Sequence, residues 1–117
     1  MTDTQEVRAA VKALDSKKAG NIKVIRIEDI SVLANYFVIA EGTSSTQVKA
    51  LADEVEFKLG ELGVQPKCSI NQQGTSWITI DYIDVVVHVF QTETRQFYGL
   101  ERLWQDGEEI NYEEFLK

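Results

Sequence analysis

The chain has 117 residues, 44% of them hydrophobic, which is typical of one globular domain with a buried core. Its formal net charge of −7 comes without a cluster of Lys and Arg, and this argues against nucleic-acid binding as the main mode. Its single cysteine, Cys68, cannot form an internal disulfide, and no apolar run approaches the ~18 residues of a membrane span. We expect a cytoplasmic protein whose best partners, by charge, are basic proteins or other cations.

The N-terminal part predicts one helix and two strands. Apolar side chains recur at helical spacing over residues 4–18, and this amphipathic helix should end at Gly20-Asn21. Residues 22–28 are rich in β-branched side chains with charges between them, which predicts a strand. Residues 36–40 are apolar on both faces, so we expect a second, central strand there.

The next part predicts a crossover connection. Ser44 is followed three residues later by Gln47, the spacing of a capping box at a helix start. An amphipathic helix should follow and end at Gly63. A strand near residues 67–70 then completes a strand, helix, strand unit, which should be right-handed.

The clearest pattern lies between Trp77 and Phe90 and predicts two strands joined by a turn at residues 81–84. The first strand alternates, which places Trp77 beside Thr79 and Asp81 on its less apolar face. The second strand is apolar on both faces and should also be central.

The C-terminal part predicts a final helix that Thr92 can cap, followed by an acidic segment. The predicted fold is therefore a single α/β domain over residues 1–105, with a mixed sheet of about five strands and helices packed on it. Residues 106–117 form the predicted acidic C-terminal tail.

A phosphate site is conceivable at Gly42-Thr43-Ser44-Ser45, where a strand turns into a helix. A nucleotidyltransferase would also need two carboxylates one residue apart on a strand, both facing metal ions. The nearest pair, Glu54 and Glu56, falls on a predicted helix, where the two side chains point to nearly opposite sides. We interpret the turn as a helix cap and predict no catalytic residue and no cofactor.

The sequence also gives little support for metal binding. Asp81 and Asp84 flank the hairpin turn, but two carboxylates without further oxygen ligands make a poor cation site. His88 is the only histidine and lies in an apolar strand, so we predict a neutral, hydrogen-bonded structural role.

Aromatic residues are more informative. Trp104 shares a helical stripe with Phe97 and Leu100 and should be buried. The periodicity points Trp77 and Tyr98 away from the buried set, and an exposed Trp and Tyr have the composition of a protein-binding hot spot.

Three motifs, taken together, carry a resemblance to a known family. They are Gly42-Thr43-Ser44-Ser45, Trp77-Ile78-x-x-Asp81-Tyr82-x-Asp84-Val85-Val86-Val87-His88-Val89-Phe90, and Arg95-x-Phe97-Tyr98-x-Leu100-Glu101-x-Leu103-Trp104. In this combination the chain resembles the ribosomal silencing factor family, RsfS, also called Iojap, from the first helix to Trp104.

The resemblance implies a cytosolic factor that binds the large ribosomal subunit through large-subunit ribosomal protein fourteen. Such a factor prevents the small subunit from joining and so represses translation when nutrients run short. The resemblance also implies a nucleotidyltransferase-like fold without that catalysis.

Joining the resemblance to the periodicity places the partner contacts on one face of the Trp77 strand and the outward side of the last helix. Trp77 and Tyr98 should be the anchors, and the carboxylates should meet Lys or Arg of the partner. The predicted contact residues are Trp77, Thr79, Asp81, Asp84, Arg95, Tyr98 and Glu101. Two alternatives stay open: a nucleotidyltransferase-like nucleotide-binding enzyme, and a homodimer that pairs its aromatic face with itself.

Overall fold

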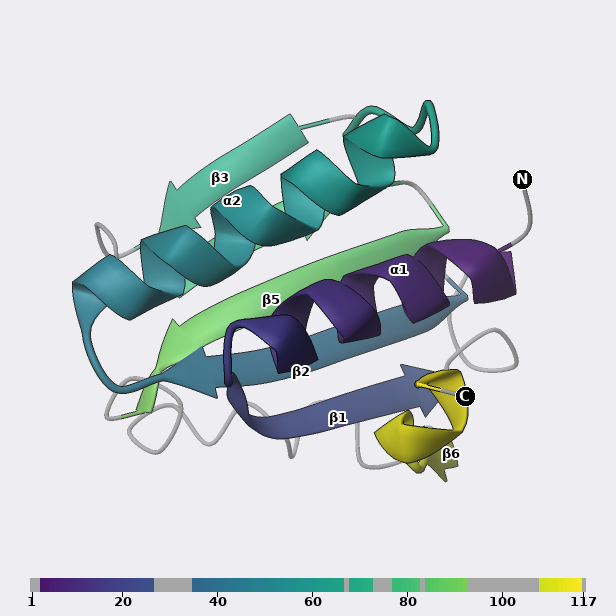
Figure 1. Ribbon diagram of the computed structural model, residues 1–117, viewed down its shortest axis with the longest axis horizontal. Helices are drawn as coiled ribbons and strands as arrows, with labels where there is room; N and C mark the ends of the chain where they lie inside the picture. Colours follow the sequence, from purple (N-terminus) through teal and green to yellow (C-terminus); the bar gives the residue numbers. More distant parts are fainter. Residues whose placement is uncertain are drawn as a thin grey trace.

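The computed structural model describes residues 3–26, 35–66, 68–72, 77–82, 84–92 and 108–116. In Figure 1 the α-helices of the described residues lie across one face of a sheet. The elements in chain order are α1 (Asp3–Ser16), β1 (Gly20–Arg26), β2 (Tyr36–Gly42), α2 (Ser45–Glu61), β3 (Cys68–Gln72), β4 (Trp77–Asp81), β5 (Val85–Gln91), β6 (Glu108–Ile110) and a short 3-10 helix, η2 (Tyr112–Phe115).

The sheet has the order β3-β4-β5-β2-β1-β6 and is mixed. β2 and β5 pair in parallel at its centre, and the other neighbours pair antiparallel. The predictions of two central strands and of a hairpin between β4 and β5 are confirmed. The predicted count of about five strands falls short of the six strands found among the described residues, because β6 comes from the segment predicted to be a tail.

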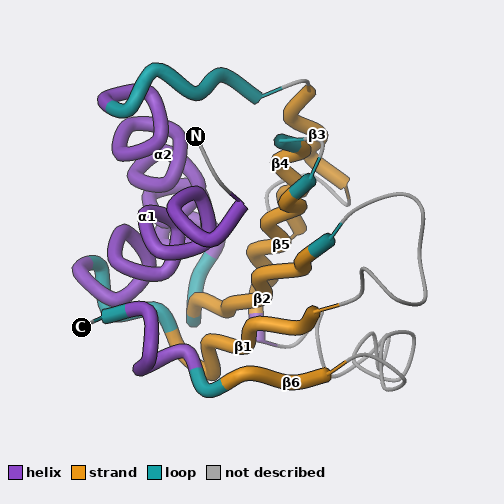
Figure 2. Tube along the Cα trace, turned by 90° about the vertical axis from the view of Figure 1, so that its right-hand side faces the viewer, coloured by secondary structure: helices purple, strands orange, loops and turns teal. Residues whose placement is uncertain are grey.

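The crossover from β2 through α2 to β3 follows the prediction. β3 runs in the same direction as β2, with β5 and β4 between them, and α2 lies in front of the sheet in Figure 1, which gives a right-handed connection. Both helices lie on the same side of the sheet (Figure 2). Of the helices in the described part of the chain, none is long and apolar enough to cross a membrane.

The main core lies between the helices and the sheet. α1 contributes Val7 and Leu14 to this core, α2 contributes Leu51 and Leu59, and all four are fully buried. The C-terminal segment joins the same core, since Phe115 of η2 is only 7% exposed and β6 pairs with β1. Residues 108–116 therefore pack onto the domain, while the predicted boundary between residues 105 and 106 lies outside the described residues.

The start of α2 confirms half of the predicted capping box. The Gln47 backbone N–H donates to Ser44 Oγ at 3.2 Å, as a cap requires. The Gln47 side chain does not return to the Ser44 N–H. Its Oε1 accepts from the backbone N–H of Thr43 at 2.7 Å and from the Thr43 hydroxyl at 3.0 Å, so it gains two donors from one residue.

The C-terminal ends of α1 and α2 close in the same way, but only the end of α2 was predicted. After α2, Gly63 adopts φ of 83°, and the Val64 N–H donates to the Leu59 carbonyl at 2.9 Å. The predicted end of α1 at Gly20-Asn21 is wrong, because Lys18 adopts φ of 62° and ends the helix earlier. Gly20 instead begins β1.

Candidate protein-binding surface

The sheet face opposite α1 and α2 carries the predicted contact strand, and we call it the Trp77 face (Figure 2). Its apolar side chains form a cluster separate from the main core. The alternation of β4 is confirmed, since Ile78 and Ile80 belong to the main core and Trp77 to the second cluster. The Trp77 face consists of Trp77, Thr79 and Asp81 from β4, Val86, His88 and Phe90 from β5, Phe37 and Ile39 from β2, and Ile25 from β1.

Trp77 was predicted to be exposed, and the structure shows it partly buried. Phe90 lies opposite it in the β4–β5 register, and the two ring centroids are 5.0 Å apart. The indole Nε1–H donates to His88 Nδ1 at 3.4 Å. These contacts hold the indole in one orientation while part of its surface stays accessible.

The ring of His88 lies beside the Trp77 indole and helps to hold it in place. Its ring stacks on Phe90 with centroids 5.9 Å apart and planes at 4°, and it meets Phe37 edge-on at 5.3 Å. Burial lowers the pKa of His88 from 6.5 to about 4, so the ring is neutral at pH 7. Because Nδ1 accepts from the indole, the ring proton belongs on Nε2. The predicted neutral, hydrogen-bonded role is confirmed.

Thr79 contributes more to internal packing than to the accessible surface. It is 9% exposed, and its hydroxyl lies 3.4 Å from His88 Nδ1, directly across the β4–β5 register. Although Thr79 was predicted to touch a partner, this position leaves it little surface to offer.

The two predicted acidic contacts lie at the border of the face. Asp81 ends β4 and is partly exposed, and Asp84 in the following turn is exposed. The Asp84 backbone is held firmly, since its carbonyl accepts from the N–H groups of Asn35 at 2.8 Å and Tyr36 at 3.1 Å. The turn thus presents one carboxylate to solvent from a fixed position. In the described residues no three His, Cys, Asp or Glu side chains gather in a way that could hold a metal ion.

The contacts predicted for a final helix are not placed by the structure. Arg95, Tyr98 and Glu101 lie outside the described residues, as does Trp104. Within the described part, the structure brings together Trp77, Thr79 and Asp81 on one strand with Asp84 at its turn. Sequence reasoning missed the support that His88 and Phe90 give to the indole, although the hairpin register contains that signal.

The turn considered for phosphate binding serves as a helix cap. The N–H groups of Thr43, Gln47 and Val48 all bond within the turn. The carboxylates that follow lie on α2 and form ion pairs along it, Asp53 with Lys49 at 3.5 Å and Glu54 with Lys58 at 3.9 Å. This arrangement agrees with the prediction of a cap.

Comparison with known proteins gives concordant results. A family model described as "Ribosomal silencing factor during starvation" matches residues 1–117. Proteins named ribosomal silencing factor RsfS from Bacillus subtilis and Halalkalibacterium halodurans are 39% and 36% identical, covering 92% and 97% of this chain and 91% and 97% of their own lengths. A crystal structure of a protein from Chromobacterium violaceum superposes with a TM-score of 0.86 at 33% identity, covering 95% of this chain and 92% of that one.

Proposed function

Since this chain belongs to the ribosomal silencing factor family, we propose that it binds the large ribosomal subunit through large-subunit ribosomal protein fourteen and blocks joining of the small subunit. By doing so it represses translation, and it acts in the cytoplasm. The mechanism requires a footprint that overlaps that of the small subunit, and it requires no bond to be made or broken. We therefore propose a binding protein and not an enzyme.

The observation that supports this proposal most directly is the packing of Trp77. An indole held against Phe90 and His88 has lost much of its rotational freedom before a partner arrives, so binding costs less conformational entropy. Large, pre-oriented aromatic residues are frequent anchors of protein interfaces.

Charge supports a basic protein as the partner. Asp81 and Asp84 border the Trp77 face, and the chain as a whole carries −7. A basic ribosomal protein would attract this surface, while exposed ribosomal RNA would repel it. The proposed contact set remains Trp77, Asp81 and Asp84 from the described part, with Thr79 as support, and Arg95, Tyr98 and Glu101 from the predicted final helix.

The test is co-sedimentation with large subunits and a subunit-joining assay on sucrose gradients. Trp77→Ala and Tyr98→Ala should each weaken binding by about 2 kcal/mol or more, and should allow subunits to join at protein concentrations where the unaltered chain blocks them. Phe57→Ala is the matched control, because it removes an exposed aromatic ring from the opposite, helical face. Unchanged binding by both Trp77→Ala and Tyr98→Ala would contradict the proposed surface.

The charge part of the proposal has its own test. Asp84→Lys reverses an exposed carboxylate at the border of the Trp77 face and should slow association with the subunit. Asp53→Lys makes the same charge change on α2 and should leave association nearly unaltered. Equal effects of the two would show that only net charge matters.

The rival reading is a nucleotide-binding enzyme of nucleotidyltransferase-like fold. The nucleotidyltransferase-like fold remains a prediction. At the Gly42 turn, the N–H groups of Thr43 and Gln47 donate to side chains of the helix cap. Calorimetric titration with a nucleoside triphosphate and Mg²⁺ distinguishes the two hypotheses, because a nucleotide-binding enzyme requires saturable heat of binding.

A further inference from the structure

A groove lies between α1 and α2, on the side of the molecule that points away from the Trp77 face (Figure 2). It has a volume of about 540 Å³ and opens to solvent. Its α1 wall contains Gln5, Ala9, Lys12 and Ser16, which form one stripe because they recur at intervals of three or four residues. At about 1.5 Å per residue, this wall is about 16 Å long, or about three helical turns. The groove is therefore elongated, and it suits a segment of polypeptide better than a compact small molecule.

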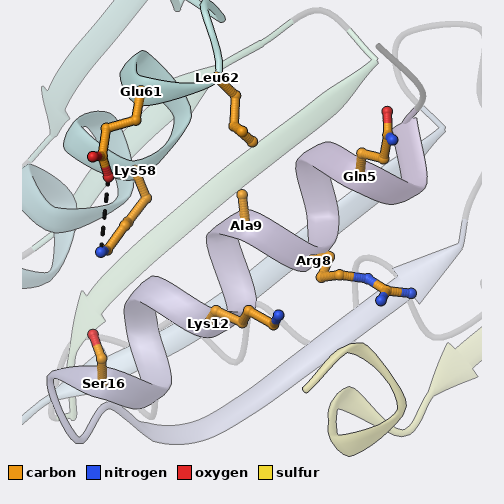
Figure 3. A pocket seen from close by; sticks show the side chains of 8 residues that line it. All are labelled: Gln5, Arg8, Ala9, Lys12, Ser16, Lys58, Glu61 and Leu62. Atoms are coloured by element: carbon orange, nitrogen blue, oxygen red, sulfur yellow. Dashed lines mark ion pairs between the residues drawn. The ribbon is translucent and has the colours of Figure 1, made fainter. Parts of the chain in front are cut away.

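The middle of the groove is apolar. In Figure 3, Leu62 from the C-terminal end of α2 and Ala9 from α1 point toward one another across it. Leu62 is 47% exposed, whereas Leu51 and Leu59 of the same helix are fully buried. Because the short side chain of Ala9 cannot cover it, Leu62 presents apolar surface that a partner would bury with a gain in free energy.

One exposed cation of the groove has no partner of its own. Lys12 lies on the α1 wall, and no carboxylate in the described ranges is within ion-pair distance of it. Lys58 on the opposite wall is already shared between Glu54 at 3.9 Å and Glu61 at 3.8 Å. Arg8 also lines the groove, but its guanidinium points away from α2 in Figure 3, and it has an interaction of its own. Lys12 is therefore the cation that a carboxylate entering the groove would meet.

This combination of length, apolar centre and cation matches an amphipathic helix. Such a helix presents apolar residues along one stripe, and acidic residues at the border of that stripe would meet Lys12. α1 and α2 run in opposite directions (Figure 1), so a third helix can pack along both of them at once. Because the chain carries −7 overall, an acidic partner is attracted only where a cation such as Lys12 dominates locally.

We propose that the α1–α2 groove binds an acidic amphipathic helix of another protein. The apolar residues of that helix lie against Ala9 and Leu62, and a carboxylate at the border of its apolar stripe pairs with Lys12. The Trp77 face stays accessible on the other side of the sheet. The groove is thus a second interaction surface, and it does not depend on the proposed binding to the ribosome.

The first test uses synthetic helices as probes. A hydrocarbon-stapled peptide of about 14 residues, with leucines along one face and glutamates at both borders of that face, spans the groove. It should bind the full chain saturably in fluorescence anisotropy. The same peptide with lysines in place of the glutamates should bind about tenfold more weakly or not at all. Net charge alone predicts the reverse order, so equal binding, stronger binding of the lysine peptide, or no saturable binding of the acidic one overturns the proposal.

The second test assigns the binding to the groove. Lys12→Glu should weaken binding of the acidic peptide about tenfold, and Leu62→Ser about fivefold or more. Lys17→Glu is the charge control, because Lys17 is exposed beyond the end of α1 and does not line the groove. Phe57→Ser is the apolar control, because Phe57 is 59% exposed on α2 and does not line the groove either. Equal effects within either pair would contradict the assigned site, provided that circular dichroism shows an intact fold in all four variants.

The third test separates the groove from the Trp77 face. Amide chemical-shift changes caused by the acidic peptide should concentrate on α1 and the C-terminal turn of α2. An excess of this peptide should also leave co-sedimentation of the chain with large ribosomal subunits unchanged. Shift changes confined to β4 and β5, or release of the chain from the subunits by the peptide, would show that the peptide occupies the Trp77 face and would refute a separate site. Absence of subunit binding by the unaltered chain would contradict only the proposed ribosomal function.

Discussion

His88 should make the stability of this protein depend on pH in a range where carboxylates are still ionised. Burial lowers the pKa of His88 from 6.5 in the unfolded chain to about 4 in the folded one. As pH falls through 6.5, His88 binds a proton in the unfolded state but not in the folded state. The free energy of unfolding therefore decreases. The contribution of His88 is complete above pH 6.5 and is lost progressively down to about pH 4.

The size of this effect follows from the two pKa values. Their difference corresponds to about 3 kcal/mol when the whole range is crossed. Between about pH 7.5 and about pH 5.5, where most carboxylates keep their charge, the expected loss is about 1.3 kcal/mol. His88 is the only histidine in the chain, so no other imidazole contributes.

Urea unfolding at these two pH values, followed by tryptophan fluorescence, measures the loss. His88→Gln is the informative variant, because its amide oxygen can still accept from the Trp77 indole but does not titrate. The unaltered protein should lose about 1.3 kcal/mol more than His88→Gln over this step. Equal losses in the two proteins would refute the claim that His88 is buried in its neutral form.

Three further predictions concern stability and can be checked by the same urea unfolding at pH 7.5. Gly63→Ala should cost about 1 kcal/mol, because Gly63 holds φ of 83°, whereas the matched change Gly60→Ala, inside α2 with open space around it, should be neutral or stabilise by up to about 1 kcal/mol. Ser44→Ala should cost about 1 kcal/mol through loss of the bond to the Gln47 N–H. Phe115→Ala should cost about 3 kcal/mol if the C-terminal segment is part of the core, and an effect below about 0.5 kcal/mol would mean that it is not.

The sequence predicted best where local patterns decide the structure. The alternation around Trp77 assigned the faces of β4 correctly, since a strand has a fixed period of two. The cap at Ser44 and the helix end at Gly63 are also local, and both were found. Prediction failed at Lys18, where a residue other than glycine adopts the left-handed conformation.

Non-local pairing explains the remaining differences. β6 joins the sheet through contacts with β1, which precedes it by more than eighty positions, and no local pattern in Glu108–Ile110 indicates this. The contacts that hold the Trp77 indole were missed for a related reason. Its neighbours His88 and Phe90 follow from the hairpin register, which the bond from the Tyr82 N–H to the Val85 carbonyl fixes.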